Sequence, residues 1–293
     1  MSASVSSKSG KAARSAQEIR RVITGNIGWV ACGIALLCVI GPLIDIVGVV
    51  GYNGLSAFSV KLFTPTGNGT SGGLLNAIEG TFIITVGAMI FAVPIGVGAG
   101  IYLSEYGNNK LGATIRFMSD VLTGTPSVVL GYFSYVVFVI SLGWDFSALA
   151  AAITIAILIV PYLARITELA LRQVPVSMRE AGFALGATEP TVVFKIVLPG
   201  ALSGVVTGAL LALAISVGET APLIYTAGWS ASLWHGKLTH EPVGYLTYVI
   251  WTAFEQPTSE AHALAFAAAF LVMLVVLAIN IGVRLVVRRT KFV

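Results

Sequence analysis

Residues 78–103 read IEGTFIITVGAMIFAVPIGVGAGIYL, a run in which Glu79 is the only charged side chain. A helix needs roughly 20 apolar residues to cross the hydrocarbon core of a bilayer, so this run predicts a membrane span. Comparable runs occupy residues 27–50, 117–142, 147–164, 200–222 and 262–287. The sequence therefore predicts an all-α polytopic membrane protein with six transmembrane helices.

The overall composition excludes an ordinary soluble protein. Of 293 residues, 56% are hydrophobic and 10% are charged, whereas about a quarter of a soluble domain is charged. The net charge of +4 does not indicate a nucleic-acid partner, because a basic footprint needs a solvated surface. Cys32 and Cys38 share one apolar stretch and imply no disulfide framework. The bilayer is the expected surrounding.

The basic residues predict the orientation, since Lys and Arg gather on the cytoplasmic side of membrane proteins. With six spans and a cytoplasmic N-terminus, 15 of the 17 basic residues lie inside, and only Lys61 and Lys237 lie outside. Both termini are then cytoplasmic. The predicted divisions are a flexible basic cytoplasmic tail (1–26), a first helix with its external loop (27–73), a transmembrane domain (74–287) and a cytoplasmic C-terminal tail (288–293).

Few motifs indicate chemistry within the chain. The sequence has no G-x-x-x-x-G-K-[ST] motif to bind ATP phosphates, and neither H-E-x-x-H nor C-x-x-C to bind a metal. We therefore expect neither an enzyme nor a cofactor-binding chain. Gly96, Gly98 and Gly100 are interpreted as small residues that let helices approach closely. The external segments 51–77 and 223–261 form either aromatic lids or a docking surface.

The inner connection, residues 165–199, predicts a short helix followed by another. Pro175 suits the start of the first helix, Gly186 its end, and Pro190 the first turn of the next. Small residues on the first helix would let the backbone of another protein approach closely. The alternative is an interfacial helix lying on lipid. Docking of a protein is the favoured interpretation.

Three motifs resemble those of a known family. The segment EAGFALGA (180–187), followed by IVLP (196–199), resembles the coupling loop of ABC-importer permeases, which seats in a cytosolic ATPase. The segments GTPSVVLG (124–131) and GETAPL (218–223) look like motifs of phosphate-importer permeases, of the PstA-like type. The resemblance extends from about residue 74 to the C-terminus.

The resemblance implies the type I importer permease fold and a role in moving inorganic phosphate inward across the bacterial cytoplasmic (inner) membrane. It also implies three partners: a second, PstC-like permease, a PstB-like ATPase dimer that binds ATP and Mg, and an external PstS-like phosphate-binding protein. An ABC permease for another oxyanion or polar solute remains an alternative. So does an ion-coupled secondary transporter.

Two sets of residues follow as candidates. The set for coupling to the ATPase is Arg179, Glu180, Ala181, Gly182, Ala184, Leu185, Gly186 and Ala187. The set for lining or gating the substrate pathway is Thr123, Thr125, Pro126, Ser127, Arg165, Ser216, Glu219 and Thr220.

The pathway set rests on the cost of polar groups in hydrocarbon. Pro126 interrupts helical hydrogen bonding beside three hydroxyls, either to serve the anion or simply to kink a helix. Glu219 either accepts the proton that phosphate carries or forms a structural ion pair. Ser216 stands where the family often has an arginine, so Arg165 is the nearest substitute cation, unless it snorkels to the interface. Glu168 and Arg172 are expected to form an ordinary helix-surface pair.

Overall fold

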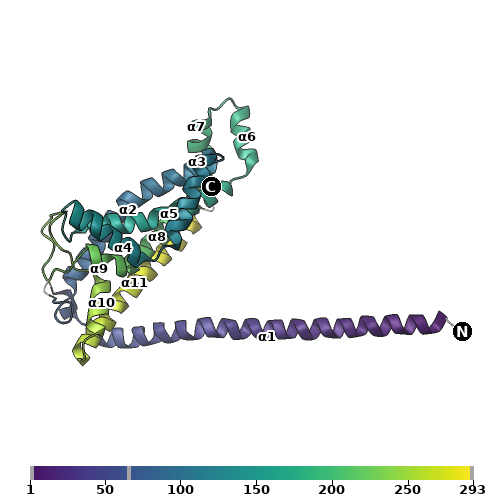
Figure 1. Ribbon diagram of the computed structural model, residues 1–293, viewed down its shortest axis with the longest axis horizontal. Coiled ribbons are helices and arrows are strands. Elements are labelled where there is room, and N and C mark those ends of the chain that lie inside the picture. Colours follow the sequence, from purple (N-terminus) through teal and green to yellow (C-terminus); the bar gives the residue numbers. More distant parts are fainter. Residues whose placement is uncertain (1–2, 65–66, 291–293) are drawn as a thin grey trace. The chain divides into compact units, whose positions relative to one another are not determined.

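The computed structural model describes residues 3–64 and 67–290, and side chains from Arg20 to Leu285 outside the 65–66 gap. The chain divides into two compact units, one up to Tyr52 and one from Asn53 onward. Figure 1 shows the helices. Their bounds are α1 Ala3–Ala57, η1 Val60–Phe63, α2 Leu75–Ile101, η2 Tyr102–Tyr106, α3 Lys110–Gly124, α4 Ser127–Ser134, η3 Tyr135–Ser141, α5 Ala148–Arg172, α6 Val176–Ala184, α7 Glu189–Val192, η4 Val193–Val197, α8 Leu198–Gly218, α9 Ala221–Thr226, α10 Leu246–Phe254 and α11 Ser259–Thr290.

The N-terminal unit consists of the greater part of α1. Residues 3–26, for which we predicted a flexible tail, belong to this helix. Alongside its serines the segment carries Ala, Lys and Arg, which are good helix formers, and the first proline of the chain is Pro42. The apolar part, Arg20–Ala57, is long enough to cross a membrane.

The six predicted spans agree with the described part of the chain, with one difference in shape. Five helices are long and apolar enough to cross a membrane, and a bent pair makes up to six. The predicted run 117–142 is this pair: α3 and the α4–η3 segment meet at 101°. Pro126 causes the break, because its ring keeps Thr125 out of the helical region (φ −78°, ψ 130°). The predicted interruption at Pro126 is therefore confirmed, and it divides the span into two helices.

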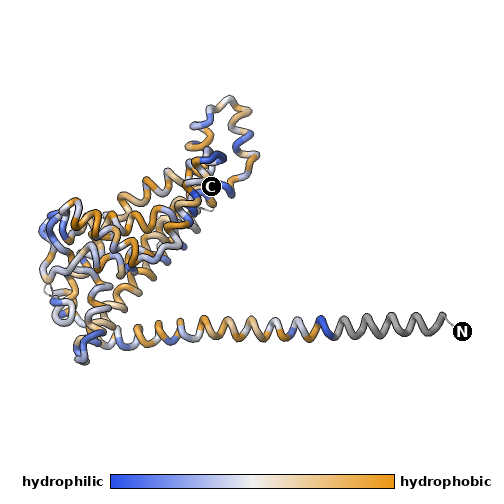
Figure 2. The backbone as a smooth tube through the Cα atoms, in the orientation of Figure 1, coloured by the Kyte–Doolittle hydropathy of each residue, from blue (hydrophilic) through white to orange (hydrophobic). Residues whose placement is uncertain are grey.

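The second unit, Asn53 onward, has an apolar middle and polar ends, as Figure 2 shows. At one end the α6–α7 hairpin projects, and at the other lie the loops around η1 and between α9 and α10 (Figure 1). The hairpin is shorter than the predicted connection 165–199, because α5 continues to Arg172 and helical residues resume at Glu189. Polar ends on an apolar middle fit a bundle that spans a bilayer.

The core of this unit is the packing of α2 against α5. A Cβ at Gly96 would lie 2.6 Å from Leu163 Cβ, and one at Gly100 would lie 2.4 Å from Thr167 Cβ. Only glycine allows backbones this close, which confirms the prediction for Gly96 and Gly100. Gly98 has open space beside it, so its glycine is not needed for this contact.

We expect Gly100→Leu to force α2 away from α5 and to destabilise the protein by about 1–3 kcal/mol, the usual cost of overpacking. Gly98→Leu adds the same side chain to the same helix in open space and is the matched control. Thermal unfolding of the purified chain in detergent measures both. Equal melting temperatures for the two variants would contradict the packing argument.

Candidate functional site

A cavity of about 230 Å³ lies among α3, α4, α5 and α8. It collects residues from both predicted pathway motifs, although they are almost 100 positions apart in the sequence. Its lining residues are Leu122, Thr123, Thr125, Ser127, Leu158, Ile159, Tyr162, Ile215 and Glu219. The structure thus brings four of the eight predicted pathway residues into one site.

Two helix breaks build this cavity. One is the interruption at Pro126 between α3 and α4, and the other is the extended residue Glu219 (φ −67°, ψ 136°) between α8 and α9. A Cβ at Gly131 would lie 2.5 Å from Pro222 Cα, so α4 and α9 approach at a glycine. Paired discontinuous helices are a recurrent way to place backbone ends around a transported solute.

The hydroxyl groups of the site differ in whether they can donate a hydrogen bond to a solute. Thr123 donates to the Ser119 carbonyl and Thr125 to the Val121 carbonyl, both at 2.8 Å. Each hydroxyl has one proton, so neither donates to a solute in this conformation. Within the described chain, no hydrogen bond of the Ser127 or Tyr162 hydroxyl is recorded. These two are therefore the hydroxyl donors for the cavity.

Ser127 is also the first residue of α4. The first N–H groups of a helix lack partners within the helix, and the helix dipole makes this end partly positive. An oxyanion in the cavity would meet this helix end together with the Ser127 hydroxyl. Glu219, in contrast, contributes a carboxylate, and its carbonyl accepts a hydrogen bond from the Thr247 hydroxyl at 2.8 Å.

The other predicted pathway residues lie outside the lining. Ser216 is buried and its hydroxyl donates to the Leu213 carbonyl at 2.7 Å. Thr220 lines a separate cavity beside α10, and Pro126 forms the break itself. Arg165 is paired with Glu168, its Nη1 lying 3.1 Å from Glu168 Oε2.

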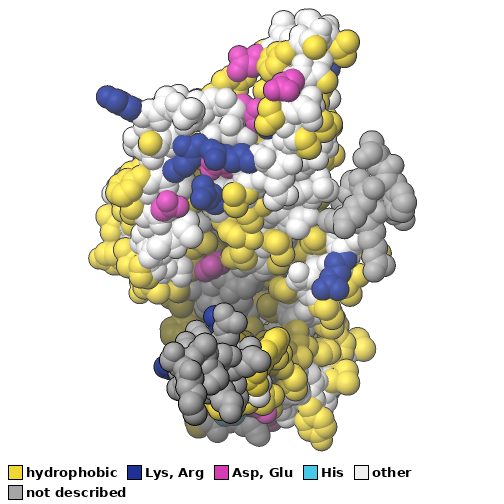
Figure 3. Space-filling view, turned by 90° about the vertical axis from the view of Figure 1, so that its right-hand side faces the viewer, with side chains coloured by type: hydrophobic (Ala, Val, Ile, Leu, Met, Phe, Trp, Pro, Cys, Tyr) yellow, Lys and Arg dark blue, Asp and Glu magenta, His cyan; other side chains and the backbone are white. Residues whose placement is uncertain are grey.

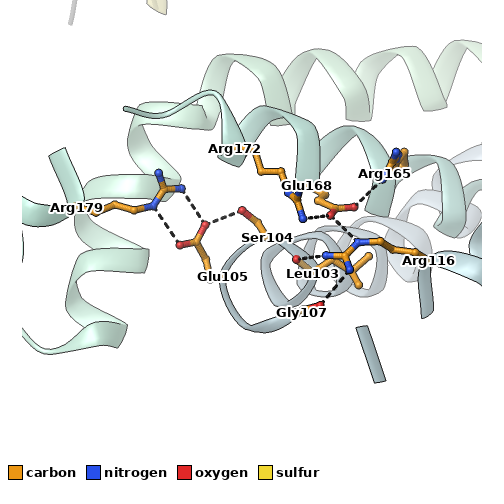
Figure 4. Close-up of polar contacts among 9 residues, drawn as sticks. All are labelled: Leu103, Ser104, Glu105, Gly107, Arg116, Arg165, Glu168, Arg172 and Arg179. Carbon is orange, nitrogen blue, oxygen red and sulfur yellow. Dashed lines mark hydrogen bonds and ion pairs between the residues drawn. The ribbon is translucent and has the colours of Figure 1, made fainter. Parts of the chain in front are cut away.

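Glu168 is the centre of a charge cluster at the hairpin end of the bundle (Figure 4). Its side chain is 1% exposed. Arg116 Nε and Arg172 Nη2 each lie 2.8 Å from Oε1, while Arg165 approaches Oε2. The predicted pair with Arg172 is confirmed, but our expectation that it lies on the helix surface was wrong, because Glu168 is buried. The spacing of Glu168 and Arg172 was visible in the sequence, but the long-range partner Arg116 on α3 was not.

The predicted coupling set divides into three parts. Glu180, Ala181 and Ala184 are exposed on α6, and Leu185, which follows its last residue, is 88% exposed. Three further residues build the hairpin: a Cβ at Gly182 would lie 2.6 Å from Ile196 Cδ1, Gly186 has a φ of 79°, and the Ala187 N–H donates to the Gly182 carbonyl. The positive φ of Gly186 and the hydrogen bond from Ala187 to Gly182 together form a glycine-terminated helix end.

Arg179, the remaining member, extends from α6 toward the bundle and is 18% exposed. In Figure 3 the basic side chains on this face gather beside acidic ones below the projecting hairpin. Arg179 therefore contacts the body of the protein, whereas the exposed surface of α6 is formed by Glu180 and by small and apolar neighbours.

The outer loop between α9 and α10 is ordered by polar contacts. Glu241 accepts the N–H groups of His235 (2.8 Å) and Lys237 (3.1 Å) and contacts His235 Nδ1 at 2.7 Å. Burial raises the pKa of Glu241, but these hydrogen bonds outweigh it and lower the pKa below its ordinary value. Nearby, Trp229 stacks on Tyr248 with ring centroids 4.7 Å apart. The loop thus presents a fixed surface.

The fold defines a polytopic membrane transport protein with a projecting hairpin, and the comparisons agree. Residues 92–292 match the family model described as "Binding-protein-dependent transport system inner membrane component", and the chain belongs to this family. The MetNI methionine ABC transporter, in an inward-facing crystal form, is similar in fold. The match has a TM-score of 0.63 at 23% identity and covers 74% of this chain and 95% of that one.

Relatives in sequence are more specific. The chain is 43% identical over 265 residues to the phosphate transport system permease protein PstA 2 of Mycobacterium bovis, covering 90% of this chain and 88% of the relative. It is 39% identical over 242 residues to PstA of Yersinia pestis, covering 81% of each. It is 34% identical to a probable PstA of Methanocaldococcus jannaschii, covering 90% of this chain and 94% of the relative.

We expect Glu168→Ala to destabilise the protein by about 1–3 kcal/mol, because Arg116 would lose its buried charged partner while the half-exposed Arg165 and Arg172 stay hydrated. Asp120→Ala removes an exposed carboxylate from α3 and should change the stability by less than about 0.5 kcal/mol. Unfolding of both variants in detergent provides the measurement. A Glu168 variant as stable as the Asp120 variant would show that the cluster contributes nothing to folding.

Proposed function

We propose that the chain is the permease subunit of an ATP-driven importer that moves inorganic phosphate into the bacterial cytoplasm. One structural observation carries this proposal. Two broken helices converge on a cavity that offers a helix N-terminus, the Ser127 and Tyr162 hydroxyls and the Glu219 carboxylate. The PstA relatives support phosphate as the solute.

The chemistry of the cavity suits a protonated oxyanion. Phosphate at neutral pH carries negative charge and still holds a proton. The oxygens of the anion accept hydrogen bonds from Ser127, Tyr162 and the first turn of α4. Glu219 as a carboxylate only accepts, so it pairs with the proton of the phosphate. Sulfate has no proton at neutral pH and would meet Glu219 as an unrelieved like charge.

A second permease chain completes the pathway. Among the described residues, the lining of the cavity includes no Lys or Arg, and Arg165 is held by Glu168. An anion in a membrane pathway needs a compensating cation or further donors. We infer that a PstC-like partner provides them across the shared pathway, with Glu219 at the boundary between the chains.

The hairpin and the outer loops support the two remaining proposed partners, the ATPase and the external binding protein. The exposed Ala181, Ala184 and Leu185 of α6 fit a groove of a PstB-like ATPase dimer, which binds the ATP and Mg that this chain has no motif to hold. The basic cluster around Glu168 lies at the hairpin end, which the positive-inside rule makes cytoplasmic. The ordered outer loops then face a PstS-like binding protein.

The test is reconstitution of the chain with these three partners in vesicles. We expect ATP-dependent uptake of phosphate and at least tenfold slower uptake of sulfate and molybdate. Uptake of sulfate at the same rate would refute phosphate specificity and leave the permease function intact. Uptake by the purified chain alone, driven by an ion gradient without ATP, would refute the importer function in favour of a secondary transporter.

We expect Ser127→Ala and Tyr162→Phe each to reduce phosphate uptake by about 10- to 100-fold. A hydrogen bond to a charged group contributes roughly 1.5–3 kcal/mol, and 1.4 kcal/mol corresponds to tenfold. Thr114→Ala and Tyr106→Phe remove hydroxyl groups that lie away from the cavity and should transport normally. Uptake by the reconstituted complex is the measurement, and normal rates for both cavity variants would disprove their role.

We expect Leu185→Asp to weaken binding of the ATPase at least tenfold, because a charge replaces an apolar side chain that would be buried on docking. Val60→Asp, at an apolar residue 87% exposed on η1, is the matched control at the opposite end. Affinity is measured by titrating the ATPase into the solubilised permease. Equal affinities for the two variants would place the docking surface elsewhere.

A further inference from the structure

Arg179 forms four hydrogen bonds that tie α6 to the bundle. Its Nε and Nη2 donate to the two carboxylate oxygens of Glu105 at 3.3 Å and 3.0 Å (Figure 4). Its Nη1 donates to the Val174 carbonyl at 2.6 Å, and Nη2 also donates to the Leu171 carbonyl at 2.9 Å. A planar guanidinium that binds a carboxylate through two nitrogens has a fixed orientation.

The acceptors belong to two different helices. Leu171 and Val174 lie at the end of α5, directly before α6, whereas Glu105 lies in η2 at the end of α2, 74 positions away. The Ser104 hydroxyl donates to Glu105 Oε1 at 2.7 Å and steadies the carboxylate. The side chains of Glu105 and Arg179 are only 11% and 18% exposed. Water therefore competes little for this pair.

A second arginine holds the same segment from the other side. Arg116 of α3 donates to the carbonyls of Leu103 at 2.7 Å and Gly107 at 3.0 Å while its Nε binds Glu168 of α5. The held segment η2 is a π-helical turn. Such turns are local interruptions that frequently occur at functional sites. The inner end of α2 is thus fixed by side chains of α3 and α6.

These contacts define a mechanical route from α6 to the cavity. A displacement of α6 moves Arg179, which moves the end of α2 through Glu105 and the end of α5 through two carbonyls. Helix α2 packs on α5 at Gly96 and Gly100, so the two helices move together. Helix α5 carries Ile159 and Tyr162 of the cavity, and the Glu168–Arg116 pair continues the route to α3.

We propose that Glu105 and Arg179 form a coupling clamp, which passes movement of the docked hairpin to the pathway helices. Arg179 is a positioning residue and touches neither the solute nor the ATPase. The inference rests on the proposed function, since it requires α6 to dock on an ATPase. Its specific content is that docking and transmission belong to different side chains of the same short helix: the exposed Leu185 docks, and the inward Arg179 transmits.

The experiment uses the reconstituted complex with Glu105→Gln, Arg179→Gln and the double variant, with Glu189→Gln as control. Glu189 is an exposed acid of the same hairpin without a role in the clamp. Three quantities are measured: affinity for the ATPase, ATP hydrolysis, and solute taken up per ATP. We expect affinity within threefold of the unaltered chain, retained hydrolysis, and uptake per ATP at least tenfold lower in all three clamp variants.

The double variant separates transmission from folding, because it leaves no unpaired buried charge. If a single variant no longer folds and assembles into the complex, the clamp is judged on the uptake per ATP of the double variant. A double variant that couples as well as the unaltered chain would overturn the clamp. A loss of ATPase affinity equal to the loss of uptake would also overturn it, because the pair would then serve docking.

The unaltered complex separates this inference from the proposed function. If it binds no ATPase, the proposed function fails before the clamp is tested. If it transports another solute, uptake per ATP is measured with that solute, and the clamp is judged on the same ratio.

Discussion

Unpaired backbone groups are costly in hydrocarbon, and this cost governs the arrangement of the site. Among the described residues, one candidate span is broken at Pro126, and another ends at Gly218, where Glu219 separates α8 from the short α9. Each interruption leaves helix ends without internal partners. Non-helical backbone at this depth is tolerated where it lines a cavity. Both breaks border the same cavity, and the approach of Gly131 to Pro222 holds them together. The pathway is thus the place where the bundle accommodates its irregular backbone.

The spans could be predicted from the sequence because a 20-residue apolar run has few alternatives in water. The interruption within 117–142 could also be predicted, but its angle of 101° could not, since hydropathy reports composition and not direction. Pro126 was the available signal, and its effect on Thr125 accounts for the break. Gly96 and Gly100 were predicted as packing residues, but Gly98, in the same pattern, packs against nothing. Spacing alone does not tell which side of a helix meets a neighbour.

The site was predictable where polar residues stand out against apolar surroundings. Ser127 and Glu219 lie in conspicuous motifs, and the structure brings them together. Tyr162 was missed because an aromatic residue in an apolar span is ordinary. Its position, three residues before Arg165 and directly after Pro161, was the only hint. The environment of Glu168 was misjudged for a different reason: its partner Arg116 is 52 positions away, and no local pattern reveals such a contact.

The few charges of the chain serve two separate purposes. At the hairpin end, Glu105 and Glu168 are paired with arginines and fix the ends of four helices to one another. In the cavity, Glu219 has no arginine of this chain among the described residues, and its neighbours are hydroxyls. A charge that is paired with an opposite charge holds two helices together, whereas a buried charge without such a partner is stabilised by any group that can pair with it. Glu219 is therefore suited to bind a solute reversibly, and the clamp residues are suited to transmit the movement of the hairpin.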